Sequence, residues 1–167
     1  MEFLTGCTEI EDLDPFVAEL NRIGNKHDCA VQAFDARYVV GRQQLERAVA
    51  LANRATERGE RIARERSVEI LLYAAGRRQI NRAFEIGVSE GKCEVVIVVD
   101  GASKKDENRA IDALSEHVEP ASWNLGDRTD PERIADFYEI TDAEREATDA
   151  TLEKLVCERV ALLVVEQ

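Results

Sequence analysis

The chain has 167 residues, of which 22 are basic and 34 acidic, for a formal charge of −12. Its length predicts one domain spanning residues 1–167, and 44% hydrophobic residues with only three prolines exclude a disordered chain. The longest apolar runs, Ile70–Ala75, Val95–Val99 and Val160–Val165, are far shorter than the roughly 20 residues of a membrane span. Because Met1–Gly6 lacks the basic and apolar segments of a signal peptide, we expect a cytoplasmic protein.

The basic residues are concentrated in one segment of this acidic chain. Residues 37–82 contain eleven arginines and five glutamates, whereas residues 93–167 contain eight basic and 19 acidic residues. A basic segment attracts phosphate or a carboxylate-rich partner. The alternative is that these arginines lie on solvated helix faces and pair with Glu46, Glu57, Glu65 or Glu85. The 17 arginines against five lysines, with acidity spread along the second half, indicate a halophilic protein adapted to a salt-rich cytoplasm.

The first third of the chain predicts two strands and a helix. Strands are expected at Met1–Cys7 and at Cys29–Phe34, where apolar and polar residues alternate imperfectly. Between them, Asp14–Pro15 is a typical helix start, and the helix is expected to end near Gly24.

Three helices are expected between residues 42 and 87. Arg42–Arg58 has apolar residues on one face and Gly59 to end it, and Val68–Ala75, capped by Ser67, is apolar on nearly every face and therefore buried. Arg77–Ile86 is expected to form the third helix, with three side chains facing inward: Ile80, Ala83 and Phe84.

The second half predicts a central strand and further helices. Cys93–Asp100 is too continuously β-branched for a sheet edge, and residues 103–116 have a helical pattern. Asp130–Pro131 begins another helix, and Val160–Val165 is expected to close the chain as a strand. The predicted fold is α/β or α+β, one domain with helices packed on a central mixed or antiparallel sheet.

Enzyme motifs give little support for catalysis. The segment Gly87–Gly91 matches the G-x-S-x-G pattern around Ser89, but a helix is predicted before it and a strand after it, the reverse of a serine-hydrolase elbow. The sequence has no phosphate-binding glycine motif, and its histidines, His27 and His117, stand apart from each other and from any cysteine pair. We therefore expect a protein without catalytic residues, metal or cofactor.

The arginine-rich segment contains the strongest candidate binding residues. Arg77, Arg78 and Gln79 directly follow Gly76, with Arg82 one turn later, and further arginines precede them at Arg54, Arg58 and Arg61. Guanidinium groups, an amide side chain and free backbone amides at a helix start can hold a phosphate and read a base edge. This combination favours a short single-stranded nucleic acid.

Two motifs, Gln32–Ala36 and Ser67–Ile80, together with Gly87, resemble the small kinase-binding subunit of the archaeal and eukaryotic KEOPS complex, the PRPK-binding protein family. The resemblance implies a non-catalytic subunit of the machine that installs threonylcarbamoyladenosine (t6A) at position 37 of tRNA. Such a subunit binds the complex's atypical kinase, supports its ATPase activity, and in archaea helps recruit tRNA by holding the single-stranded 3′ CCA end.

On this resemblance, the matched residues Arg77, Arg78, Gln79 and Ile80 are the expected contacts of the CCA end. The kinase interface cannot be assigned to residues from the sequence, although an exposed apolar patch is expected there. A charge of −12 departs from what RNA binding favours, so base stacking and hydrogen bonds should matter more than attraction to phosphates. Two other hypotheses are a regulatory domain that binds a small anion at Arg77–Arg78 and a serine hydrolase that uses Ser89.

Overall fold

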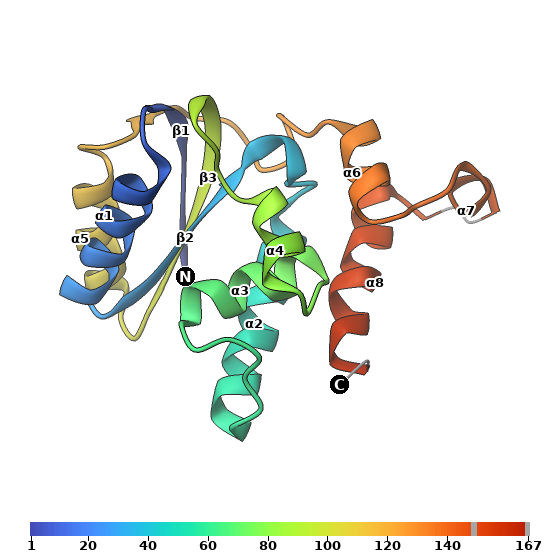
Figure 1. Cartoon of the computed structure of the whole chain (residues 1–167), viewed down its shortest axis with the longest axis horizontal. Coiled ribbons are helices and arrows are strands. Elements are labelled where there is room, and N and C mark those ends of the chain that lie inside the picture. The colour runs from blue at the N-terminus through green and yellow to red at the C-terminus, as the bar shows by residue number, and fades with distance from the viewer. Residues whose placement is uncertain (148–149, 166–167) are drawn as a thin grey trace. The chain divides into compact units, whose positions relative to one another are not determined.

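The computed structural model describes residues 1–147 and 150–165. Contacts divide the chain into two compact units, each built from two separate segments (Figure 1). Unit 1 comprises Met1–Ala36 and Gly87–Trp123, and unit 2 comprises Arg37–Ile86 and Asn124–Gln167. The expectation that residues 1–167 fold as one domain stays a prediction.

Unit 1 contains the sheet. Its four strands are β1 (Glu2–Ile10), β2 (Cys29–Asp35), β3 (Gly91–Gly101) and the short β4 (Glu119–Pro120). They are ordered β2-β3-β1-β4, and every neighbouring pair is antiparallel. The predicted α+β class with an antiparallel sheet is confirmed, as is the central position of the β-branched strand, β3.

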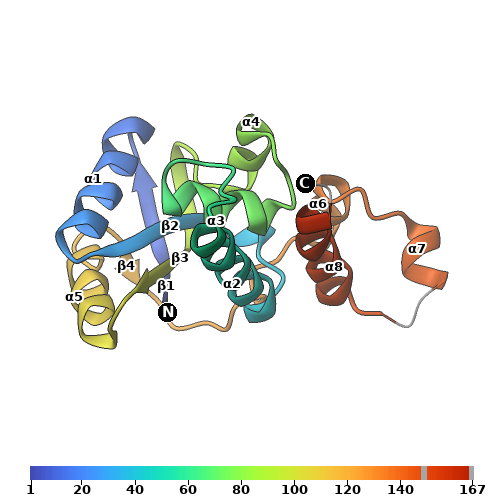
Figure 2. The same ribbon diagram turned by 90° about the horizontal axis from the view of Figure 1, so that it is seen from below.

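The core of unit 1 follows from alternation along the strands. Val95, Ile97 and Val99 of β3 share one face, and the sheet residues beside them include Leu4 and Val31. Helices α1 (Leu13–Lys26) and α5 (Lys104–Leu114) lie side by side on this face (Figures 1 and 2). Helix α1 begins slightly before the predicted Asp14–Pro15 start.

Unit 2 is helical. Its elements include α2 (Arg42–Arg58), α3 (Arg66–Ala75), the single turn α4 (Ile80–Ala83), the 3-10 turn η2 (Phe84–Ile86), α6 (Pro131–Phe137), α7 (Asp142–Ala147) and α8 (Leu152–Val165), and the 3-10 turn η1 (Ala36–Tyr38) lies at its start. Helix α2 has the predicted bounds because Gly59 ends it in the left-handed conformation, at φ 70°. It packs against both α3 and α8.

The prediction that Val160–Val165 is a strand was wrong, because this run forms the last part of α8. Its apolar stretch is no longer than a strand, so length and composition could not separate the two structures. In the structure the run continues a helix in which Val156, Val160 and Leu163 are buried at helical spacing.

The prediction of a helix over Arg77–Ile86 was also wrong. Helix α3 ends at Gly76, and only one helical turn and a 3-10 turn follow, beginning at Ile80. Ala83 faces inward as expected, whereas Ile80 and Phe84 are 40% and 53% exposed. Ser67 is not the cap of α3, which begins one residue earlier, at Arg66.

None of the helices in the described part of the chain is both long and apolar enough to cross a membrane.

Candidate functional site

The predicted binding segment begins where Gly76 ends α3. Gly76 has a φ of 62°, and the amides of Gly76 and Arg77 donate to the carbonyls of Tyr73 and Leu72, at 3.1 Å each. A Cβ at this position would lie 3.0 Å from the Arg159 carbonyl oxygen. Glycine therefore satisfies two needs here, a left-handed turn and close approach of α8.

Arg77 turns inward from this point. Its Nη2 donates to the Phe137 carbonyl oxygen at 2.5 Å, and its guanidinium lies 5.3 Å from the centre of the Phe137 ring. The Glu139 carboxylate is 3.8 Å from Nη1. Arg77 therefore stabilises the end of α6 and the residues that follow it. The sequence did not predict this structural contact.

Arg159 on α8 also forms hydrogen bonds with the residues that follow α6. Its Nε donates to the Tyr138 carbonyl at 3.1 Å, and its Nη2 donates to both Glu144 carboxylate oxygens at 2.8 Å. The Tyr138 hydroxyl is buried, where it donates to the Ala74 carbonyl at 2.6 Å and accepts from Gln44 at 2.8 Å. Burial raises the pKa of Tyr138 well above its usual range, so the phenol stays neutral.

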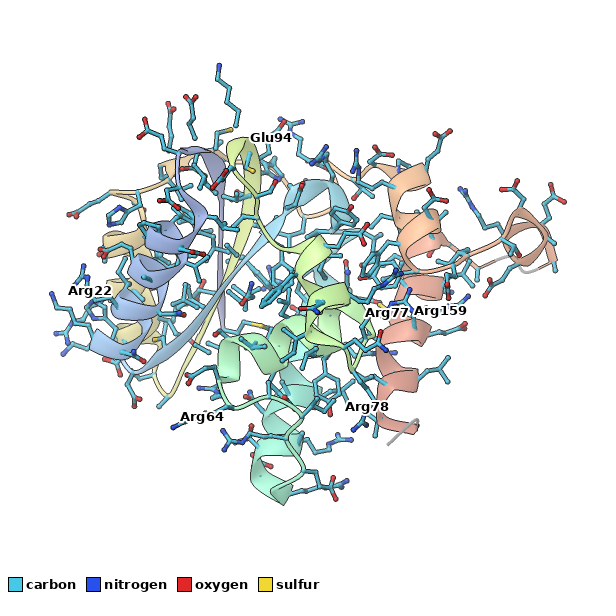
Figure 3. The ribbon with its side chains drawn as sticks, viewed as in Figure 1. Arg22, Arg64, Arg77, Arg78, Glu94 and Arg159 are labelled. Carbon is cyan, nitrogen blue, oxygen red and sulfur yellow. The ribbon has the colours of Figure 1, made fainter. Side chains whose placement is uncertain are left out.

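A pocket of about 460 Å³ opens at this end of α3. We call it the α3-end pocket; its lining includes Arg77, Arg78, Gln79, Glu139, Arg159 and Leu162. Figure 3 labels the three arginines at this place. Three of the predicted site residues are therefore brought together, and two of their neighbours in the pocket, Arg159 and Leu162, come from α8.

Several of the predicted arginines have exposed side chains. In residues 1–147 and 150–165, no carboxylate forms an ion pair with Arg54, Arg58, Arg78 or Arg82. The alternative of pairing with neighbouring glutamates holds for Arg42, which contacts Glu46 at 2.6 Å. These four exposed guanidiniums are free to meet an external anion.

The predicted residues form two groups, which lie at opposite ends of α3. Gln44 near the start of α2 donates to Ala74 at 3.5 Å, whereas Asn53 near its end accepts from Arg66 at 3.0 Å, so the two helices are antiparallel. The ten residues of α3, about 15 Å long, separate the α3-end pocket from the second group. This second group consists of Arg54, Arg58 and Arg61, and it is joined by Arg64, whose carbonyl accepts a hydrogen bond from Arg61 at 3.1 Å.

Comparison with protein-family models shows the family to which the chain belongs. Residues 9–163 match the model described as kinase binding protein CGI-121. The chain belongs to the CGI-121 family. A comparison with curated proteins finds no match.

The match runs through both units of this CGI-121 family member and confirms the kinase-binding family that the two sequence motifs indicated. It does not single out residues.

This CGI-121 family member also exposes large apolar side chains in unit 2. Ile80 begins the α4 turn and Phe84 begins the 3-10 turn η2 that follows it, and both side chains are exposed. Leu162 on α8 is 46% exposed and lines the α3-end pocket. The sequence did not predict this surface, because Phe84 was expected to face inward and Val160–Val165 to be a strand. A helix over residues 152–165 places Arg159 and Leu162, three residues apart, on one face.

Two further features concern the G-x-S-x-G motif and metal binding. The G-x-S-x-G motif lies between the 3-10 turn η2 and strand β3, which is the element order expected from the sequence and the reverse of a hydrolase elbow. Among the residues that the structure describes, no cluster of three or more histidine, cysteine, aspartate or glutamate side chains could hold a metal.

Proposed function

We propose that this CGI-121 family member is a non-catalytic regulatory subunit of the KEOPS complex in the cytoplasm. It binds the complex's atypical kinase, supports its ATPase activity, and helps recruit tRNA through the 3′ CCA end for t6A modification. The family match carries the kinase-binding half of this proposal. The motifs Gln32–Ala36 and Ser67–Ile80 support the KEOPS assignment.

The tRNA half rests on the exposed end of α3. Arg78 and Gln79 line the pocket, Arg82 follows one turn later, and the apolar Ile80 is exposed between them. Unpaired guanidiniums attract phosphates, while an apolar surface and an amide side chain suit unstacked bases. Arg77 contributes to this site indirectly. Its guanidinium donates a hydrogen bond to the Phe137 carbonyl and so stabilises the lining of the pocket.

Kinase docking fits the exposed apolar side chains of unit 2. Interface cores are apolar and rich in aromatic residues, and Phe84 is the most exposed large hydrophobic residue described. Because Ile80 lies in the CCA segment and Leu162 lines the α3-end pocket, we assign docking to Phe84.

Capture of the purified kinase tests this half. The variant Phe84→Glu should weaken capture at least tenfold, since a charge placed in an interface core is unpaired and desolvated. Val17→Glu is the matched control, because Val17 is also 40% exposed but lies on α1 in unit 1. Equal loss in both variants, or in neither, would contradict the assignment.

The alternative is a regulatory domain that binds a small anion without nucleic acid. The observation that favours it is the pocket itself, whose lining contains three guanidiniums, those of Arg77, Arg78 and Arg159. Co-elution with tRNA and kinase would exclude this alternative, whereas phosphate binding with neither partner would support it.

A further inference from the structure

Glu69 is a buried acidic residue in the first turn of α3. Its exposed fraction is 0%. A carboxylate taken out of water is costly unless hydrogen bonds replace its hydration. In the described parts of the chain no lysine or arginine forms an ion pair with it, so its compensation must come from another source.

That source is the backbone of the loop between α2 and α3. The Ile62 amide donates to both carboxylate oxygens at 3.1 Å, and the Ala63 amide donates to one of them at 2.6 Å. These amides have no place in a helix or strand, because the loop spans residues 59–65. The loop amides therefore replace the lost hydration of the carboxylate, and the carboxylate supplies the acceptors that these amides need. Charge-assisted hydrogen bonds of this kind are among the strongest in proteins.

The same loop carries exposed arginines on either side of its anchor. Ala63 is 7% exposed and fixed by Glu69, while Arg61 and Arg64 are exposed. Arg61 Nη1 donates to the Arg64 carbonyl at 3.1 Å, which further closes the loop. Arg58 lies just before it, at the end of α2. Figure 3 shows Arg64 on this loop, away from Arg78.

We propose that Glu69 is a positioning residue that fixes the loop so that Arg58, Arg61 and Arg64 bind RNA phosphates together. The inference rests on the proposed tRNA binding. It adds a second contact for the RNA, about the length of α3 away from the α3-end pocket. A fixed loop presents Arg61 and Arg64 beside Arg58 without losing conformational freedom on binding, whereas a loose loop would lose it.

Glu69→Gln tests the proposal, because glutamine keeps the side-chain volume but replaces one acceptor oxygen with a donor. Two quantities are measured on the full chain: amide hydrogen exchange at Ile62 and Ala63, and the slope of log Kd for tRNA against log KCl. Exchange at both amides should become faster. Because each phosphate contact contributes about 0.7 to 0.9 to the slope, loss of three contacts should reduce it by about two to three.

Two controls separate positioning from simple loss of stability. The triple variant Arg58→Ala, Arg61→Ala, Arg64→Ala should show the same reduced slope, and adding Glu69→Gln to it should change the slope no further. Ile70→Val, which removes one methyl group from the fully buried neighbour of Glu69, should leave the wild-type slope.

Protected amides in Glu69→Gln, or fast exchange with an unchanged slope, would overturn the positioning role while leaving the proposed function intact. Absence of tRNA binding by the wild-type chain would overturn the proposed function and this inference with it.

Discussion

The two compact units divide the charge of the chain unequally. Unit 1 has six basic and 16 acidic residues, for a formal charge of −10, whereas unit 2 has 16 and 18, for −2. Most of the net charge of −12 therefore belongs to unit 1, and the total gives no indication of the many arginines in unit 2. An anionic partner is recognised by the local field of one region, so the total is a poor guide to binding.

The arginines themselves differ between the units. In unit 1, Arg22 pairs on the surface with Glu19, at 2.6 Å. In unit 2, some arginines are used internally, as Arg77 and Arg159 are, and others, such as Arg78, are exposed and form no ion pair with any carboxylate that the structure describes. The predictions below test these three roles, beginning with the internal one.

Arg77→Ala should lower the free energy of unfolding by about 2–3 kcal/mol, because it removes a charged hydrogen bond to the Phe137 carbonyl and a cation–π contact. Urea denaturation measures this change. Arg78→Ala, the same substitution at the exposed neighbour, should change stability by less than about 0.5 kcal/mol. Equal effects of the two substitutions would contradict the distinction between internal and exposed arginines.

Gly76→Ala should cost about 1–2 kcal/mol, since alanine is strained at a φ of 62° and its Cβ would press on the Arg159 carbonyl at 3.0 Å. Gly59→Ala is the matched control. Gly59 also ends a helix with positive φ, at 70°, but has nothing within 4 Å of the added Cβ, so it should cost less. Thermal unfolding of both variants gives the comparison, and a larger loss for Gly59→Ala would refute the close approach of α8.

Arg78→Glu should weaken tRNA binding about tenfold without unfolding the protein, because an exposed cation at the pocket becomes an anion. Arg109→Glu makes the same charge change on the exposed surface of α5 in unit 1 and should have little effect. Titration of tRNA with each variant decides whether binding belongs to unit 2. Unchanged affinity of Arg78→Glu would exclude this patch as the main site.

The surface pair in unit 1 should give the smallest effect. The hydrogen bond from Arg22 lowers the pKa of Glu19 to about 2, with a smaller contribution from His117. Because the folded-state pKa lies below the unfolded one, the stabilisation is present at neutral pH and is lost as pH falls from about 4.3 towards 2. Arg22→Gln should flatten this part of the stability curve slightly, and the difference should shrink in molar salt.

Local patterns were sufficient to predict much of the fold. Continuous β-branched residues identified β3, and helical spacing followed by Gly59 gave the bounds of α2. The failure came at Val160–Val165, where a short apolar run is compatible with a strand or a buried helix. Packing against α2 and α3 determines the outcome, and the sequence does not reveal that packing.

The candidate site was predicted only in part, for a related reason. Arg77 and Arg78 are adjacent in the sequence, and no local pattern distinguishes them. One turns inward because the Phe137 carbonyl, 60 residues away in the chain, is there to accept its hydrogen bond. Leu162 was missed as a pocket residue because Val160–Val165 was predicted as a strand, and Arg159 was missed because it lies just before that run, outside the predicted binding segment.

The most direct test of the proposed function compares binding of the chain to intact tRNA and to tRNA trimmed of its 3′ CCA, at molar KCl. High salt suppresses general attraction to phosphates, so any remaining binding reports stacking and hydrogen bonds at the α3-end pocket. We expect binding to intact tRNA and at least tenfold weaker binding to trimmed tRNA. Equal binding to both, or binding to neither, would contradict the CCA-holding role.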